Sequence, residues 1–241
     1  MKITFLGTKG YIEKPTDLHR MHTSALITYR GKSIRIDCGE DWLGRCDETR
    51  AQATFITHCH LDHAFGLKSG CAGPVYATPD AWEDMGDWPI EDRRTIEHRE
   101  TVELGGISVE CFPVQHSTRC PAVGYRISAG VVTVFYVPDV VYIHDREAAL
   151  SGCDVYIGDG ATIDQNFVRK QKDTGELIGH APVRTQLTWC ERLGVPKMIV
   201  THCGNQIVQD HEAAVEQVRE YAHERGVEAE IATDGLERVL R

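Results

Sequence analysis

Four side chains that can bind a metal ion lie close together in the first third of the chain. They are His58, His60, Asp62 and His63. Imidazole nitrogens and carboxylate oxygens are ligands that a divalent ion such as zinc prefers. A bound ion can polarise a substrate oxygen and lower the pKa of water, so that hydroxide forms at neutral pH. The spacing therefore indicates a metal centre that performs hydrolysis.

Three further candidate ligands, His116, Asp139 and His202, each follow a run of residues that predicts a β-strand. The runs cover residues 107–112, 131–138 and 198–201, and a similar run at 53–57 precedes His58. A side chain at the end of a strand is held by a rigid element, as a precise site requires. These elements are therefore suited to position one metal site.

The first group has the pattern His-x-His-x-Asp-His, which resembles the signature of the metallo-β-lactamase-fold hydrolases. The resemblance implies two metal ions, one held by His58, His60 and His116, the other by Asp62, His63 and His202, with Asp139 bridging them. It also implies a shared hydroxide as the nucleophile, which Asp62 could orient. Zinc suits this nitrogen-rich set, and manganese or iron is also compatible.

The same resemblance implies an α/β fold, a four-layer αββα sandwich. Helical patterns at residues 146–150, 183–193 and 211–225, and a strand hairpin at 24–37, agree with it. Asp37 ends that hairpin in an Asp-x-Gly turn like that of the family, where it would support the metal ligands from behind. Without a linker or low-complexity segment, residues 1–241 are expected to form a single domain.

A second motif, Gly179-His180, precedes the helical pattern at residues 183–193. It resembles the phosphodiesterase branch of the superfamily, which includes ribonuclease Z and the phosphoribosyl cyclic phosphate phosphodiesterases. The resemblance implies that His180 is the general acid that protonates the leaving alkoxide. The alternative is that His180 merely begins the helix.

The charge balance favours a small substrate over a long nucleic acid. The chain has 26 basic and 36 acidic residues, a formal net charge of −10, and its basic residues do not cluster. Ribonuclease Z also usually carries a tRNA-gripping arm between the residues that match His116 and Asp139, and here that stretch is too short. A small phosphodiester, such as a cyclic nucleotide or cyclic ribose phosphate, is therefore expected.

Three other functions remain open. A ribonuclease Z-like nuclease could process RNA 3′ ends with the same ligands. A thioester or lactone hydrolase could use the same metals, and it would not depend on His180. A non-enzymatic, metal-stabilised binding module would be expected to have an incomplete ligand set, whereas this one is complete.

Three side chains are candidate substrate contacts. His22 lies in a polar loop after the first strand pattern, Arg119 follows His116 by three residues, and Asn205 follows His202 by three. Loops on a rigid scaffold often carry recognition residues. Asp159, between two glycines, is typical of a turn residue, although it could also support the site.

The chain has nine cysteines, none of them in a C-x-x-C pair. An odd count without a secretion signal indicates reduced thiols and a cytoplasmic protein. No apolar run approaches the roughly 20 residues that cross a bilayer, so no membrane association is expected. The oligomeric state is not readable from the sequence; relatives in the phosphodiesterase branch commonly form dimers, so a homodimer is considered by analogy alone.

Overall fold

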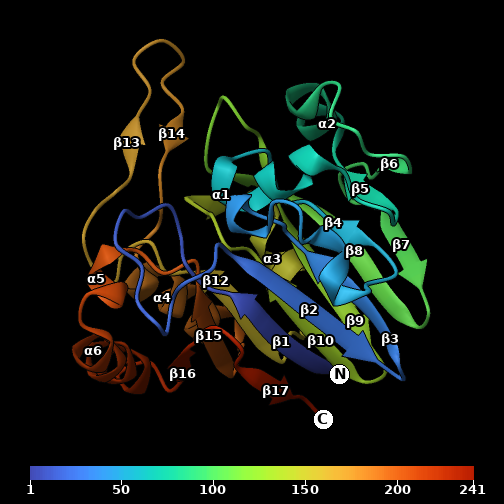
Figure 1. The fold of residues 1–241 in the computed structure, drawn as a ribbon. Helices are drawn as coiled ribbons and strands as arrows, with labels where there is room; N and C mark the ends of the chain where they lie inside the picture. Colours follow the sequence, from blue (N-terminus) through green and yellow to red (C-terminus); the bar gives the residue numbers. More distant parts are fainter.

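Two β-sheets lie face to face between two layers of helices in the computed structural model, which describes residues 1–241 (Figure 1). The first sheet has the strand order β17 (Glu237–Val239), β1 (Lys2–Gly7), β2 (Ser24–Tyr29), β3 (Lys32–Ile36), β4 (Thr54–Phe55), β5 (Val75–Ala77) and β6 (Arg93–Thr95). The second has the order β11 (Tyr142–Ile143), β8 (Ile107–Gln115), β9 (Ala122–Ala129), β10 (Val132–Tyr136), β12 (Val155–Asp159), β15 (Lys197–Thr201) and β16 (Glu228–Ile231), and β7 (Thr101–Leu104) pairs with β8.

The inner faces of the two sheets share one apolar core. Alternate residues of β1 are buried, as the two-residue period of a strand with one buried face requires. Ile3 and Phe5 of β1 belong to the same cluster as Ile127 of β9 and Ile157 of β12. This common core fixes the two sheets against each other and hence the positions of their strand ends.

Helices cover the outer faces. The second sheet packs against α4 (Val183–Leu193) and α6 (His211–His223), and α3 (Arg146–Leu150) and α5 (Asn205–Val208) lie on the same side. The first sheet is covered by α1 (Leu61–Ala64), α2 (Pro79–Met85) and the 3-10 helices η1 (Glu40–Trp42), η2 (Cys46–Thr49) and η3 (Phe65–Ser69). The predicted αββα sandwich is therefore confirmed.

Helix ends follow local signals in the sequence. α4 ends at Gly194, whose φ of 70° is a left-handed conformation that glycine adopts without strain. α6 begins where the Asp210 side chain accepts a hydrogen bond from the Ala213 amide. It ends at His223, two residues before the predicted end, because the chain turns at Gly226 with φ 64°. No helix combines the length and the apolar character needed to cross a membrane.

A two-stranded hairpin of β13 (Arg169–Lys170) and β14 (Leu177–Ile178) stands away from the sandwich (Figure 1). The sequence patterns did not predict it, because two-residue strands are too short for a periodic signal. It lies in the connection between β12 and α4, directly before Gly179-His180. The hairpin is therefore directly connected to His180, one of the predicted site residues.

Candidate active site

All seven predicted metal ligands meet at the edge of the sandwich where strands of both sheets end. His58 and His60 lie in the loop after β4, and Asp62 and His63 lie in α1. The other three follow β8, β10 and β15 as the sequence predicted: His116, Asp139 and His202. Side chains far apart in sequence are thus brought together by the ends of the strands.

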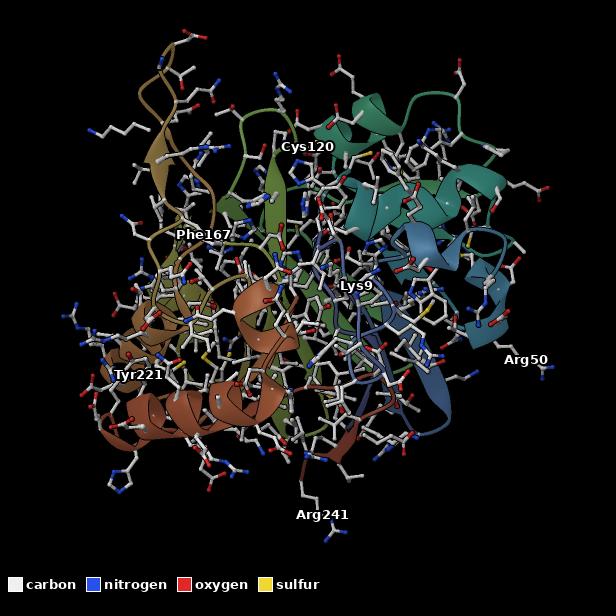
Figure 2. All side chains as sticks on the ribbon, turned by 60° about the vertical axis from the view of Figure 1, so that its left-hand side comes forward. Lys9, Arg50, Cys120, Phe167, Tyr221 and Arg241 are labelled. Atoms are coloured by element: carbon white, nitrogen blue, oxygen red, sulfur yellow. The ribbon has the colours of Figure 1, made fainter.

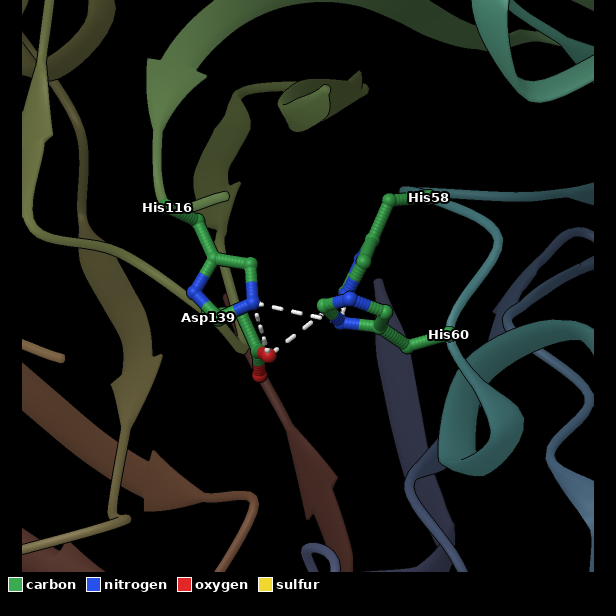
Figure 3. A group of neighbouring side chains, drawn as sticks. All are labelled: His58, His60, His116 and Asp139. Carbon is green, nitrogen blue, oxygen red and sulfur yellow. Dashed lines mark hydrogen bonds and ion pairs between the residues drawn. The ribbon is translucent and has the colours of Figure 1, made fainter. Parts of the chain in front are cut away.

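The first group contains His58, His60, His116 and Asp139 (Figure 3). His60 Nδ1 lies 2.9 Å from His58 Nε2 and 3.3 Å from His116 Nε2. Asp139 Oδ2 lies 3.1 Å from His116 Nε2 and 3.5 Å from His58 Nε2. Two ligands at 2.0–2.1 Å from a tetrahedral ion are about 3.3 Å apart, so these four atoms have the spacing of a metal site.

The second group uses the other oxygen of Asp139. Asp139 Oδ1 lies 3.1 Å from His202 Nε2 and 3.3 Å from His63 Nε2. Asp62 Oδ2 lies 3.0 Å from His202 Nε2 and 3.6 Å from His63 Nε2. Each carboxylate oxygen of Asp139 therefore faces a different group, as a bridging ligand requires.

Two unpartnered atoms support this fit. His63 Nε2 and Asp139 Oδ1 are buried and form no hydrogen bond of acceptable geometry, although they lie 3.3 Å apart. A buried polar atom without a partner costs on the order of 1–3 kcal/mol, so native proteins rarely leave one. A divalent ion in the second group would satisfy both atoms. The residues therefore fit metal ions in their number, chemistry and spacing.

The electrostatics around the ligands also suit a metal. Burial lowers the pKa of His58 well below its usual value, and lowers that of His116 to about 4, so both rings are neutral and can bind an ion. Burial opposes the charge of His202 too, but the Asp139 carboxylate outweighs it and raises that pKa to about 10. The same carboxylate charge that favours a proton on His202 would favour a metal ion beside it.

A layer of hydrogen bonds behind the ligands fixes their rings. Asp37 Oδ2 lies 2.8 Å from His63 Nδ1, and the Gly179 carbonyl lies 2.9 Å from His116 Nδ1. The Thr57 amide and hydroxyl both donate to Asp37, which orients its carboxylate. Such partners fix which ring nitrogen is free for the ion. Asp37 therefore lies where the Asp-x-Gly turn predicted it.

The backbone of His202 is also constrained. Its φ of 52° is left-handed, which residues other than glycine rarely adopt. The next amide, that of Cys203, donates to the Thr8 carbonyl at 2.6 Å and helps to hold this conformation. Such strain often marks functional sites, where the surrounding structure maintains it.

His180 stands beside both ligand groups. Its ring centroid lies 4.9 Å from that of His116 and 5.6 Å from that of His202. His180 Nδ1 lies 2.8 Å from Asp159 Oδ2. Asp159 is fully buried at the end of β12, and it also accepts hydrogen bonds from the Val140 and Ala161 amides. The turn interpretation of Asp159 was therefore incomplete, because this residue orients His180.

The Asp159 carboxylate controls the charge of His180. Burial lowers the pKa of His180, but attraction to Asp159 outweighs burial and raises this pKa above its usual value. His180 therefore keeps its proton to higher pH, as a general acid at neutral pH must.

We expect Asp159→Asn to move the alkaline limb of the pH–rate profile to lower pH, because the neutral amide no longer stabilises the imidazolium. The measurement is kcat against pH for the wild type and the variant. His180→Gln is the control, since it should lack this limb altogether. An unchanged limb in Asp159→Asn would show that another group sets it.

Two cavities open onto the ligands. One, of about 880 Å³, is bordered by His60, His116 and His180, and Arg119 lines it. The other, of about 580 Å³, also contacts these three histidines, and Asn205 lines it. Two of the three candidate substrate contacts thus lie on the walls of cavities at the site.

His22 is placed differently from the sequence expectation. It is buried and lines neither of these cavities. Its Nδ1 lies 2.9 Å from Asp41 Oδ2, a carboxylate that also pairs with Lys9 at 2.8 Å. These contacts hold His22 away from both cavities, so its expected contact with substrate is not supported, whereas Gly10, Tyr11 and Ile12 of the same loop line the smaller cavity.

The sequence model of the beta-lactamase superfamily domain matches residues 32–203, which contain all seven ligands and His180. The chain belongs to the beta-lactamase superfamily. It is accordingly a metal-dependent hydrolase, and the superfamily together with the two ligand groups implies divalent metal ions. This establishes the resemblance that the His-x-His-x-Asp-His pattern suggested.

Similar proteins agree with this assignment. Ribonuclease Z of Methanopyrus kandleri is 26% identical over 277 aligned positions, covering 96% of this chain and 95% of that protein. Other curated relatives, also ribonuclease Z sequences, match over shorter stretches, and the chain spans about half or less of their length. These sequences support the phosphodiesterase branch of the superfamily.

Solved structures show the same fold. The metallo-beta-lactamase fold protein YhfI from Bacillus subtilis has a TM-score of 0.75 at 18% identity, with 98% of each chain covered. A diphosphatase from the PhnP family has a TM-score of 0.70 at 21% identity, covering 98% of this chain and 96% of that chain. At such identities the likeness concerns the fold alone.

Proposed function

We propose that this superfamily member hydrolyses a small phosphodiester, with His180 as the general acid. The observation that carries the proposal is the position of His180. Its Nδ1 is held by Asp159, so Nε2 is the nitrogen available to donate a proton in the cavities beside the ligands. Hydrolysis of a phosphodiester releases an alkoxide, and a protonated imidazole can neutralise that leaving oxygen.

The metal ions would supply the rest of the chemistry. We propose two zinc ions, one in each ligand group, because the donor atoms are mostly imidazole nitrogens. When bound, two divalent ions polarise phosphate oxygens and activate water. Asp139 would bridge them, and the six other ligands would divide between them as the two groups do.

Asp62 would serve both as a ligand and as an acceptor of a water proton. Its Oδ2 lies 3.0 Å from His202 Nε2, and the residue also lines the smaller cavity. A carboxylate in this position can accept a hydrogen bond from the attacking water and orient its lone pair toward the phosphorus. His180 would act on the opposite, leaving oxygen.

A ribonuclease Z-like activity is the second candidate function. It is favoured by the Methanopyrus kandleri relative, which aligns with almost the whole chain. The short segment between His116 and Asp139 and the net charge of −10 favour the small substrate. Cleavage of a precursor tRNA at its 3′ trailer, with no turnover of small phosphodiesters, would favour this second candidate.

The single domain over residues 1–241, the cytoplasmic location and the homodimer stay predictions.

The test is hydrolysis of bis(p-nitrophenyl) phosphate by the metal-loaded protein, beside a lactone and a thioester. We expect turnover of the phosphodiester alone, and a loss of about a hundredfold or more in His60→Ala, because one ligand of the first group is missing. His98→Ala is the matched control, since His98 is an exposed histidine outside the ligand groups. Turnover of the esters instead, unaffected by His180→Ala, would contradict the proposal.

A further inference from the structure

The larger cavity beside the ligands is walled by two loops rather than by the sandwich itself. One wall is the segment after β8 that contains Ser117, Thr118 and Arg119, and the other is the β13–β14 hairpin. Figure 2 shows Phe167 at the base of the hairpin and Cys120 on the facing loop. The cavity therefore extends from the metal ligands outward between these two segments.

The charge of this cavity is opposite to that of the chain. Arg119 and Arg169 line it, and no aspartate or glutamate does. The chain as a whole has 36 acidic residues against 26 basic ones. A wall with two arginines and no carboxylate, in so acidic a protein, indicates an anionic occupant.

The strand register directs Arg169 into this cavity. Arg169 pairs with Ile178 across the hairpin, and both residues line the cavity, as does Gln171 two positions further along. Lys170 pairs with Leu177, and neither of them lines it. Side chains alternate between the two faces of a strand, so Lys170 lies on the opposite face.

The hairpin is joined directly to a metal ligand. The Gly179 amide donates to the His116 carbonyl at 2.9 Å, and the Thr118 hydroxyl donates to the Gln171 side chain. These bonds hold the hairpin and the Arg119 loop together on either side of the cavity. Arg169 is therefore placed relative to the reaction centre rather than on a free segment.

Neither arginine has an intramolecular partner for its charge. Arg119 and Arg169 form no ion pair and no side-chain hydrogen bond, whereas Arg94 and Arg99, which are also exposed, each pair with a carboxylate. A guanidinium has five donors in a planar fork that matches phosphate oxygens, so two unpaired ones facing one cavity can bind the same group.

The smaller cavity differs in chemistry. Apart from the metal ligands and His180, its polar lining consists of side chains without charge, such as Asn205, Gln206 and Gln209, and no lysine or arginine lines it. Amides suit hydrogen bonding to an uncharged group. The two cavities therefore differ in charge: the larger one carries two arginines, and the part of the smaller one outside the metal ligands and His180 carries no charged side chain.

We infer that Arg119 and Arg169 form a subsite for a second phosphate, carried by the substrate in addition to the phosphodiester that is cleaved. This inference rests on the proposed phosphodiesterase activity and specifies its substrate class. The second phosphate lies in the larger cavity, and the uncharged part of the substrate lies against the amides of the smaller one.

A matched pair of chromogenic substrates tests this subsite. Thymidine 5′-(p-nitrophenyl phosphate) and its 3′-phosphorylated form differ only in the second phosphate. We expect the wild type to have a kcat/KM about ten to a hundred times higher for the phosphorylated form, mainly through a lower KM. Hydrogen bonds between charged groups, here the guanidinium groups and the second phosphate, contribute enough binding free energy for a factor of this size. Arg169→Gln and Arg119→Gln should each bring the ratio of the two substrates toward one.

Lys170→Gln is the control, because it removes the same charge from the opposite face of the same hairpin. It should keep the ratio of the wild type. Equal kcat/KM values for the two substrates in the wild type would overturn the subsite. Equal effects of Lys170→Gln and Arg169→Gln would also overturn it, because they would indicate a general attraction by the positive charge of the hairpin.

Equilibrium binding separates the subsite from the proposed function. Thymidine 3′,5′-bisphosphate and thymidine 5′-phosphate are titrated calorimetrically into the metal-loaded protein. Tighter binding of the bisphosphate, lost in Arg169→Gln, would support the subsite even if neither chromogenic ester were cleaved, in which case only the phosphodiesterase proposal would fail. Equal binding of the two ligands would overturn the subsite whether or not there is turnover.

Discussion

Asp139→Asn should reduce phosphodiester turnover by about a thousandfold or more, one of the two largest effects we expect from a single substitution. Each oxygen of Asp139 faces a different ligand group, at 3.1 Å from His116 Nε2 and 3.1 Å from His202 Nε2. An asparagine has nearly the same shape but no charge, and its amide nitrogen cannot bind a cation. Loss of the bridge removes several kcal/mol of charge stabilisation, which corresponds to this factor in rate.

Metal content and thermal stability give a second readout for Asp139→Asn. An ion that binds only the folded protein raises the melting temperature of the wild type. The variant should bind fewer ions and show a smaller rise on addition of metal. Asp87→Asn, at an exposed aspartate outside the ligand groups, should behave as the wild type. Full metal content and full turnover in Asp139→Asn would show that Asp139 is not a metal ligand.

The grouping of the seven candidate ligands could be predicted from the sequence because each one carries a local signal. His58 to His63 form a compact motif, and the other three follow strands that their apolar runs predict. The sandwich then brings strand ends to a common edge, so local patterns sufficed to place the ligands at one site. The phosphodiesterase branch followed from Gly179-His180 in the same way.

The partners of those ligands carry no such signal. Asp159 and His180 are 21 positions apart, and they meet because β12 pairs in parallel with β10 and β15 and its end reaches the site. His22 is buried beside Asp41, a contact that no pattern in its own loop indicates. Such contacts depend on tertiary packing, which periodicity and motif spacing do not report.

Clusters assembled by packing were missed for the same reason. Cys46, Asp47 and Cys71 have ligand atoms within 4.8 Å of one another, although the sequence has no C-x-x-C pair. The two arginines of the larger cavity are 50 positions apart and come from a loop and a hairpin without a sequence signature. Their grouping became visible only when the hairpin was placed against the loop after β8.

His180→Gln should reduce kcat by about a hundredfold to ten-thousandfold for a substrate with an alkoxide leaving group, the usual range for loss of a general acid. Glutamine can still accept or donate a hydrogen bond in this position, but it cannot release a proton. His180 lies between the two cavities, with Nδ1 bound to Asp159, so Nε2 is the proton donor at issue. The measurement is kcat on thymidylyl-thymidine for the wild type and the variant.

The basicity of the leaving group decides whether His180 is an acid or only a packing residue. p-Nitrophenolate is a weak base and departs without a proton, so thymidine 5′-(p-nitrophenyl phosphate) should lose much less than the dinucleotide in His180→Gln. A residue that only shapes the site would affect both substrates to a similar extent. The two substrates differ in the basicity of the leaving oxygen, and a general acid matters more when that oxygen is more basic. Equal losses of kcat for the two substrates would therefore contradict the general-acid role of His180.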